Sequence, residues 1–61
     1  MNKEFNIEVK IALMKKGWKQ KDLADAIDLP VPSLRQYLNG YANYPYGIMD
    51  KIRQALNLKA V

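Results

Sequence analysis

The sequence predicts a single all-α domain of four short helices, and three observations carry that prediction. Turn-forming residues divide the chain into four segments, at Gly17, at Asp28-Leu29-Pro30 and at Asn39-Gly40. Within each segment, apolar residues recur at helical spacing. The 61 residues are 49% hydrophobic and 26% charged, which is ordinary globular usage. A chain of this length can bury one small core, so we expect residues 1–61 to form one domain.

Residues 3–16 fit two patterns. Four apolar residues alternate with polar ones, as in a strand: Phe5, Ile7, Val9 and Ile11. A second set shares one stripe of a helix: Phe5, Val9, Ala12 and Leu13. The apolar run from residue 11 to residue 14 breaks the alternation, Gly17 after two lysines is a helix stop, and Asn2 can cap the start. We therefore predict a helix.

That helix carries a second apolar stripe, formed by Ile7, Ile11 and Met14, on roughly the opposite side from the first. An apolar stripe on a helix is expected to be buried against another part of the protein or against a partner, because large apolar patches are rarely left exposed to water. We expect the segment 47–56 to pack against it, and an interface with a second subunit is the alternative.

The three later segments are also amphipathic. Asp28 tolerates the left-handed conformation of a tight turn, Pro32 suits a first helical turn, and Gly40 is a helix stop. The expected helices span residues 19–27, 32–39 and 47–56. Their inward residues are, in order, Leu23, Ala24, Ile27; Leu34, Tyr37, Leu38; and Ile48, Ile52, Ala55, Leu56.

Composition argues against an enzyme and against a bound cofactor. The chain has no cysteine and no histidine, so the usual soft nucleophile, neutral-pH base and zinc ligands are missing. Asp22, Asp25 and Asp28 recur every third residue, which is typical of a solvated helix edge. We expect no catalytic residue, no metal and no small-molecule ligand.

Nothing in the sequence indicates a membrane partner. The longest run without a charge, residues 36–49, is rich in Asn, Gly, Tyr and Pro. The N-terminal residues lack the basic-then-apolar layout of a secretory signal. We therefore expect a cytoplasmic protein.

Two short helices joined by a tight turn form a helix-turn-helix, whose second helix can enter the DNA major groove. The stretch from residue 17 to residue 40 resembles the lambda-repressor-like Cro family of phage and bacterial regulators, with the similarity extending over residues 9–58. The matching features are Gly17, Gln20, Leu23-Ala24, an apolar residue after the turn and another within the next helix, Asn39-Gly40, and Pro45. The resemblance implies a bacterial or phage-infected host cell.

The resemblance implies which residues contact bases. The outward positions of the helix 32–39 and the residue before it are those from which the family reads base edges. Gln36 can pair with adenine and Arg35 with guanine, whereas Ser33 is a less selective partner. The implied base-contacting set is Val31, Pro32, Ser33, Arg35 and Gln36.

The resemblance also implies phosphate contacts. Gln20 matches the family's glutamine at the start of the second helix, and helix N-termini bind anions. The implied set is Lys19, Gln20, Lys21, Asn39, Asn43 and Tyr44. Of the loop tyrosines we expect Tyr44 to face DNA and Tyr46 to be packed, while Trp18 fills the space between the first two helices.

The chain departs from the family pattern at several positions. Lys19 and Pro30 replace Ser or Thr helix caps, each worth about 1 kcal/mol. Leu13 and Leu38 replace an Arg–Glu pair, a change that is often neutral or stabilising. We also expect the domain to lack the family's fifth helix, which leaves open whether a homodimer forms on a palindromic site.

Charge is unevenly distributed along the chain. Residues 1–21 carry a net charge of +4, residues 22–50 carry −3 with Arg35 as the one cation, and residues 51–61 carry +3. One cation on the expected recognition helix predicts modest DNA affinity for a single subunit.

The function predicted from sequence is that of a transcriptional regulator, a Cro-like repressor that binds double-stranded DNA sequence-specifically. Two alternatives keep the same fold. One is a protein-interaction module, such as an anti-repressor or a polymerase-binding protein, favoured by the acidic middle of the chain. The other is an excisionase-type factor that bends DNA.

Overall fold

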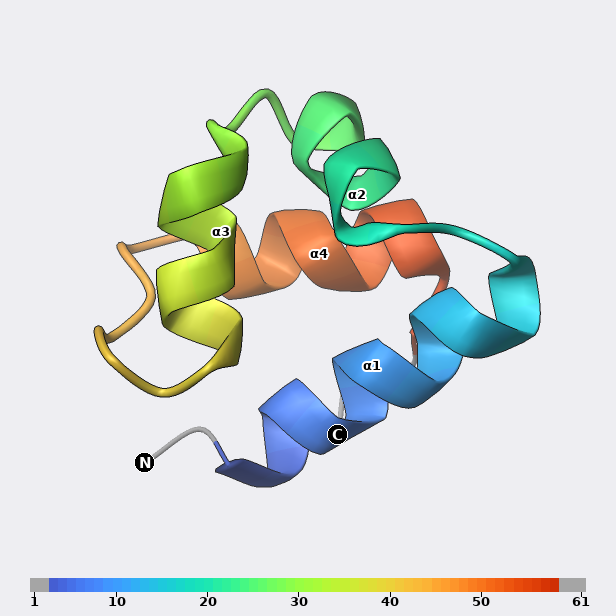
Figure 1. Ribbon diagram of the computed structural model, residues 1–61, viewed down its shortest axis with the longest axis horizontal. Helices are drawn as coiled ribbons and strands as arrows, with labels where there is room; N and C mark the ends of the chain where they lie inside the picture. Colours follow the sequence, from blue (N-terminus) through green and yellow to red (C-terminus); the bar gives the residue numbers. More distant parts are fainter. Residues whose placement is uncertain (1–2, 59–61) are drawn as a thin grey trace.

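The computed structural model describes residues 3–58 and contains four α-helices (Figure 1). They are α1 (Lys3–Lys16), α2 (Gln20–Ala26), α3 (Val31–Leu38) and α4 (Ile48–Leu56). No strand occurs in this part of the chain. The all-α prediction is confirmed, and residues 3–16 are helical rather than extended. The expected cap Asn2 lies outside the described residues.

Residues in the left-handed backbone conformation follow α1 and α2, as the sequence predicts. Gly17 has φ +74°, and the Trp18 N–H donates to the Leu13 carbonyl at 2.9 Å. Asp28 has φ +57° in the α2–α3 turn, where the Leu29 N–H donates to the Ala24 carbonyl at 2.9 Å. These bonds span six residues, as in a Schellman motif, and satisfy carbonyls that the helix leaves unpaired.

The two helices that lack a Ser or Thr cap, α2 and α3, begin in different ways. At α2, the Lys19 N–H donates to Asp22 Oδ2 at 2.8 Å, which supplies half of a capping box. At α3, Pro30 is the cap residue and makes no side-chain hydrogen bond. Pro32 occupies the first turn, where its missing N–H costs nothing. Because the Pro30 carbonyl already accepts the Leu34 N–H, α3 begins at Val31, one residue earlier than expected.

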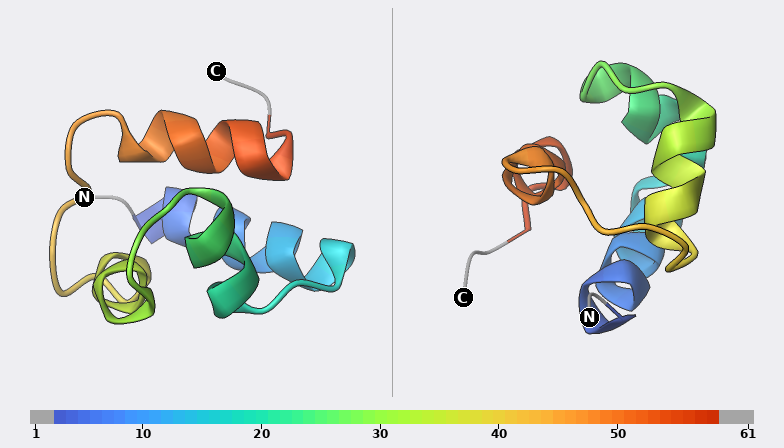
Figure 2. Two further views of the ribbon diagram at one scale, coloured as in Figure 1. Left: turned by 90° about the horizontal axis from the view of Figure 1, so that it is seen from above. Right: turned by 90° about the vertical axis from the view of Figure 1, so that its left-hand side faces the viewer.

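A single core lies between α4 and the other three helices. Figure 2 shows α4 on one side of the molecule and α1, α2 and α3 on the other. The buried apolar residues come from all four helices: Val9, Leu13, Leu23, Ala24, Ile27, Leu34, Leu38, Ile52 and Leu56. Ile48 and Ala55 are partly buried against them. The expected inward faces are thus confirmed except at Tyr37, which is half-buried and lies against Tyr44 outside this core. Leu13 and Leu38 are buried in place of the family's ion pair.

The second stripe of α1 does not pack against α4, so that expectation is wrong. Ile7, Ile11 and Met14 are 50%, 46% and 79% exposed. The helix buries Val9 and Leu13 instead, on the opposite side, and α4 packs there. One partner helix covers one face of α1, which leaves this apolar stripe open.

No helix within residues 3–58 is both long enough and apolar enough to span a lipid bilayer.

Candidate nucleic-acid interface

The outer edge of α3 is polar and open to solvent. Leu34 and Leu38 are 0% and 1% exposed, which fixes the inner face of the helix. Pro32, Arg35 and Gln36 are exposed, as is Asn39 just after the helix. The inner leucines hold α3 against α2, so its outer edge can enter a groove while the core stays closed.

Two of the expected base-contacting residues are less accessible. Val31 is half-buried and packs against the core, so its expected outward placement is wrong. The cause is the early start of α3, because residues 31, 34 and 38 then share the inner face. Ser33 is half-buried at the side of the helix.

Arg35 is available for an external partner. Within residues 3–58 the one ion pair is on α4, where Arg53 Nη1 lies 3.0 Å from Asp50 Oδ1. The aspartates of the acidic edge, Asp25 and Asp28 among them, are exposed, as expected for a solvated face. Among the described residues Arg35 therefore has no ion-pair partner, and it is the one cation in an otherwise acidic stretch of sequence, residues 22–50.

The start of α2 presents a second polar surface. Lys19 and Lys21 are exposed, and Gln20 is half-buried as the first helical residue. The first α2 hydrogen bond runs from the Asp22 N–H to the Lys19 carbonyl at 3.0 Å. The N–H groups of Gln20 and Lys21 therefore precede the helical hydrogen-bond ladder and can face an anion. The Asp22 carboxylate at the same end offsets part of the lysine charge.

The turn after α3 presents a third polar surface. Asn39 and Asn43 are exposed. The backbone there is fixed, because the Asn39 N–H donates to the Arg35 carbonyl at 3.0 Å and the Tyr41 N–H donates to the Gln36 carbonyl at 2.9 Å. The amide of Asn39 thus continues the outer edge of α3 beyond the end of the helix.

Tyr44 is packed and Tyr46 is exposed, which is the reverse of the burial expected from the sequence. The Tyr44 ring lies 5.4 Å from the rings of both Phe5 and Tyr37, measured between centroids, and its hydroxyl donates to Asn6 Oδ1. Tyr46 is fully exposed. Tyr44 is therefore a packing residue, and the expectation that it faces DNA is wrong.

Asn6 is the residue that sequence reasoning missed. It is 7% exposed and both donates and accepts: its Nδ2 donates to the Tyr37 carbonyl at 3.1 Å, and its Oδ1 accepts from Tyr44. Asn6 therefore joins α1 to the end of α3 and to the following loop. The signal was present in the helical register, since residues 6, 9 and 13 share one face.

Trp18 packs as expected. It is half-buried against the core, and the Lys16 ammonium lies 4.9 Å from the centre of its ring. Trp18 therefore packs at the junction between α1 and α2, with a cation–π contact from Lys16.

Burial of Tyr44 gives the fold a pH dependence in the alkaline range. Burial raises the pKa of Tyr44 from 10.0 to about 12. The unfolded chain therefore releases this proton at lower pH than the folded protein does. The contribution of Tyr44 to stability is complete below about pH 10 and is lost as the pH rises toward 12.

We expect the free energy of unfolding of the wild-type protein to fall between pH 10 and 12 more steeply than that of Tyr44→Phe. Denaturant titrations at several pH values measure the difference, and the variant serves as the control for all other groups that titrate in this range. Parallel pH profiles of the two proteins would show that the Tyr44 hydroxyl is not buried in solution.

Comparison with known proteins agrees with this geometry. A family model described as helix-turn-helix matches residues 9–61. The chain therefore belongs to the lambda-repressor-like, Cro/C1-type helix-turn-helix family, whose members are DNA-binding proteins. No curated protein and no solved structure gives a significant match.

Proposed function

We propose that this protein is a sequence-specific transcriptional repressor that places α3 in the major groove of double-stranded DNA. The observation that carries the proposal is the outer edge of α3, where Pro32, Arg35 and Gln36 are exposed above buried Leu34 and Leu38. A helix that binds in the major groove needs a polar outer edge for the bases and an inner face that is packed rigidly against the rest of the protein.

Each exposed side chain has a base edge that it suits. The Arg35 guanidinium can donate two hydrogen bonds to guanine, and the Gln36 amide can both donate to and accept from adenine. Pro32 offers apolar contact to a thymine methyl group, and Ser33 adds a hydroxyl at the side of the helix. Specificity on this view rests on Arg35 and Gln36.

Phosphate contacts flank α3 on both sides. Lys19, Gln20 and Lys21 lie at the start of α2, and Asn39 and Asn43 lie beyond the end of α3. Such contacts set the position and orientation of the protein on the duplex but carry no sequence information. Repression follows from occupation of a promoter site, which needs neither a catalytic residue nor a cofactor.

Selection of bound duplexes from a random pool tests the proposal. We expect enrichment of one short motif, and the length of the protected site shows whether one subunit or a pair on a palindrome is bound. A pool that shows no enrichment after repeated selection would contradict sequence-specific binding.

The affinity for duplex DNA is expected to fall linearly with the logarithm of salt concentration. If one subunit neutralises about three phosphates, the slope is about −2.7, and two subunits on a palindrome double it. Fluorescence anisotropy over a range of salt concentrations measures the slope. An affinity that does not change with salt would rule out backbone contacts as the source of binding.

The exposed stripe of Ile7, Ile11 and Met14 favours one alternative, a module that binds another protein through α1. Exposed apolar stripes of this kind occur at protein interfaces. Capture of a defined protein partner, together with the absence of any duplex in the selection, would distinguish this function from the proposed one.

A further inference from the structure

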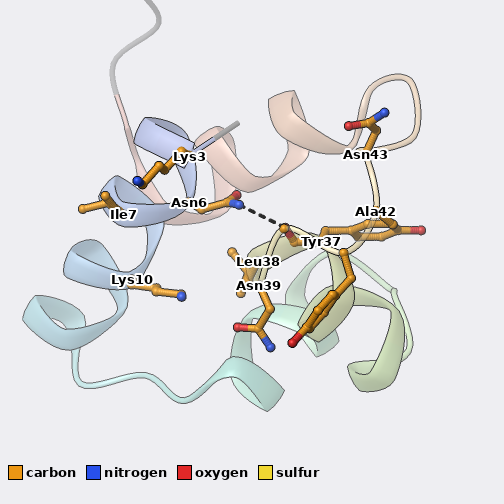
Figure 3. Close-up of a pocket in the computed structure, with 11 residues that line it drawn as sticks. Lys3, Asn6, Ile7, Lys10, Tyr37, Leu38, Asn39, Ala42 and Asn43 are labelled. Atoms are coloured by element: carbon orange, nitrogen blue, oxygen red, sulfur yellow. Dashed lines mark hydrogen bonds between the residues drawn. The ribbon is translucent and has the colours of Figure 1, made fainter. Parts of the chain in front are cut away.

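A groove of about 560 Å³ lies between the end of α3 and α1. One wall is α1, with Lys3, Ile7 and Lys10, and the other is the end of α3 with the following turn, including Asn39 and Asn43. Figure 3 shows Lys10 reaching from α1 toward Asn39, with the Asn6–Tyr37 hydrogen bond joining the two walls.

The groove carries positive charge without a counter-charge. Lys3 and Lys10 are the charged members of its lining, and no carboxylate lines it within the described part of the chain. The two glutamates of α1, Glu4 and Glu8, do not contribute to its walls. Lys3 and Lys10 are seven residues apart, so they lie on the same side of α1 two turns from each other.

This spacing favours a polyanion over a small ion. Seven residues of helix advance about 10 Å, whereas successive phosphates of one DNA strand advance about 3.4 Å along the duplex axis. The two lysine positions on α1 are thus separated along the helix by a length that corresponds to about three phosphates, which suits a polyanion better than one small anion.

The groove is continuous with the proposed DNA interface. Asn39 belongs both to the outer edge of α3 and to the lining of the groove, and Asn43 lines it as well. A strand whose phosphates pass Asn39 as α3 enters the major groove therefore reaches the α1 wall next.

We propose that this groove is a second backbone-binding site, in which Lys10 and Lys3 of α1 contact phosphates of the DNA strand that passes the end of α3. The proposal rests on the proposed function and extends it. The α1 lysines add charge that the recognition helix, with Arg35 alone, does not supply, and their contacts are independent of base sequence.

Charge-matched variants test the site. Lys10→Ala should weaken binding about five- to tenfold, to the selected duplex and to a random duplex alike, and should lower the magnitude of the salt slope by about 0.9. Lys3→Ala should act in the same direction. Lys51→Ala is the control, because it removes one charge from an exposed position on α4 that does not line the groove. We expect that variant to bind within twofold of the wild-type protein.

Neutralising single phosphates locates the contact. Duplexes with one methylphosphonate at each backbone position in turn should reveal a phosphate whose neutralisation weakens the wild-type protein but not Lys10→Ala. Equal affinities and equal salt slopes for Lys10→Ala and Lys51→Ala would overturn the proposal and assign the groove to another occupant.

Failure of this proposal is distinguishable from failure of the proposed function. If a motif is selected and depends on Arg35 and Gln36 while Lys10→Ala behaves like Lys51→Ala, only the groove assignment is wrong. If no duplex is bound by the wild-type protein, both are wrong.

Discussion

Leu34→Ala is expected to remove most of the folding stability of the domain and to leave a substantial fraction of the protein unfolded at room temperature. Leu34 is 0% exposed and lies in the core between the helices of the helix-turn-helix. Truncating such a leucine costs about 2–5 kcal/mol, because a cavity remains where its side chain packed. A domain of this size has roughly 3–5 kcal/mol of stability in total. One core substitution therefore removes most or all of it.

Thermal and urea unfolding followed by circular dichroism measure this loss. Ile11→Ala is the matched control, because it removes a similar aliphatic side chain at a position that is 46% exposed. Its effect should be within about 0.5 kcal/mol of zero, as for most surface substitutions. Similar destabilisation by the two variants would contradict the assignment of Leu34 to the core.

Arg35→Ala and Gln36→Ala are each expected to weaken binding to the selected site by about 1–3 kcal/mol and to relax the base preference at one position. This corresponds to about a 5- to 150-fold loss of affinity. Both side chains are exposed on the outer edge of α3, so the substitutions should leave the fold intact.

Competition binding against duplexes altered at one base pair at a time measures the base preference. Lys51→Ala controls for the lost charge of Arg35, and Gln54→Ala, at an exposed position of α4, controls for Gln36. Equal weakening on cognate and random duplexes would reassign either residue to the DNA backbone.

The sequence predicts the parts of the fold that depend on periodicity and turn chemistry. Apolar spacing places Leu34, Leu38 and Ile52 in the core, and the structure agrees. Asp28 and Gly17 adopt the left-handed conformations that their positions indicate. These features depend on residues close together in sequence, so local patterns are sufficient to find them.

Long-range contacts explain two of the wrong predictions, and a local cap explains a third. The hydroxyl of Tyr44 finds its partner in Asn6, 38 residues away, and no local pattern distinguishes Tyr44 from Tyr46. The stripe of Ile7, Ile11 and Met14 was expected to pack against the last helix. Both sides of α1 are apolar in sequence, so the sequence alone does not show against which side that helix packs. At Val31 the error was one residue, because Pro30 serves as the cap of α3.

The candidate site also has a part that local sequence patterns predict and a part that depends on long-range packing. The outer edge of α3 could be predicted, since it is the complement of the buried leucines. The groove beside α1 could not be predicted, because Lys10 and Asn39 come together only when α1 packs against the end of α3.

Leucine at positions 13 and 38 makes ionic strength an unusually clean experimental variable for this domain. Both side chains lie in the apolar core, and the ion pair in the described structure, Arg53–Asp50, is solvent-exposed. Exposed pairs contribute little, and added electrolyte mainly screens charges at the surface. Raising the salt concentration should therefore detach nucleic acid without loosening the scaffold, so that the measured slope counts displaced counterions and not partial denaturation.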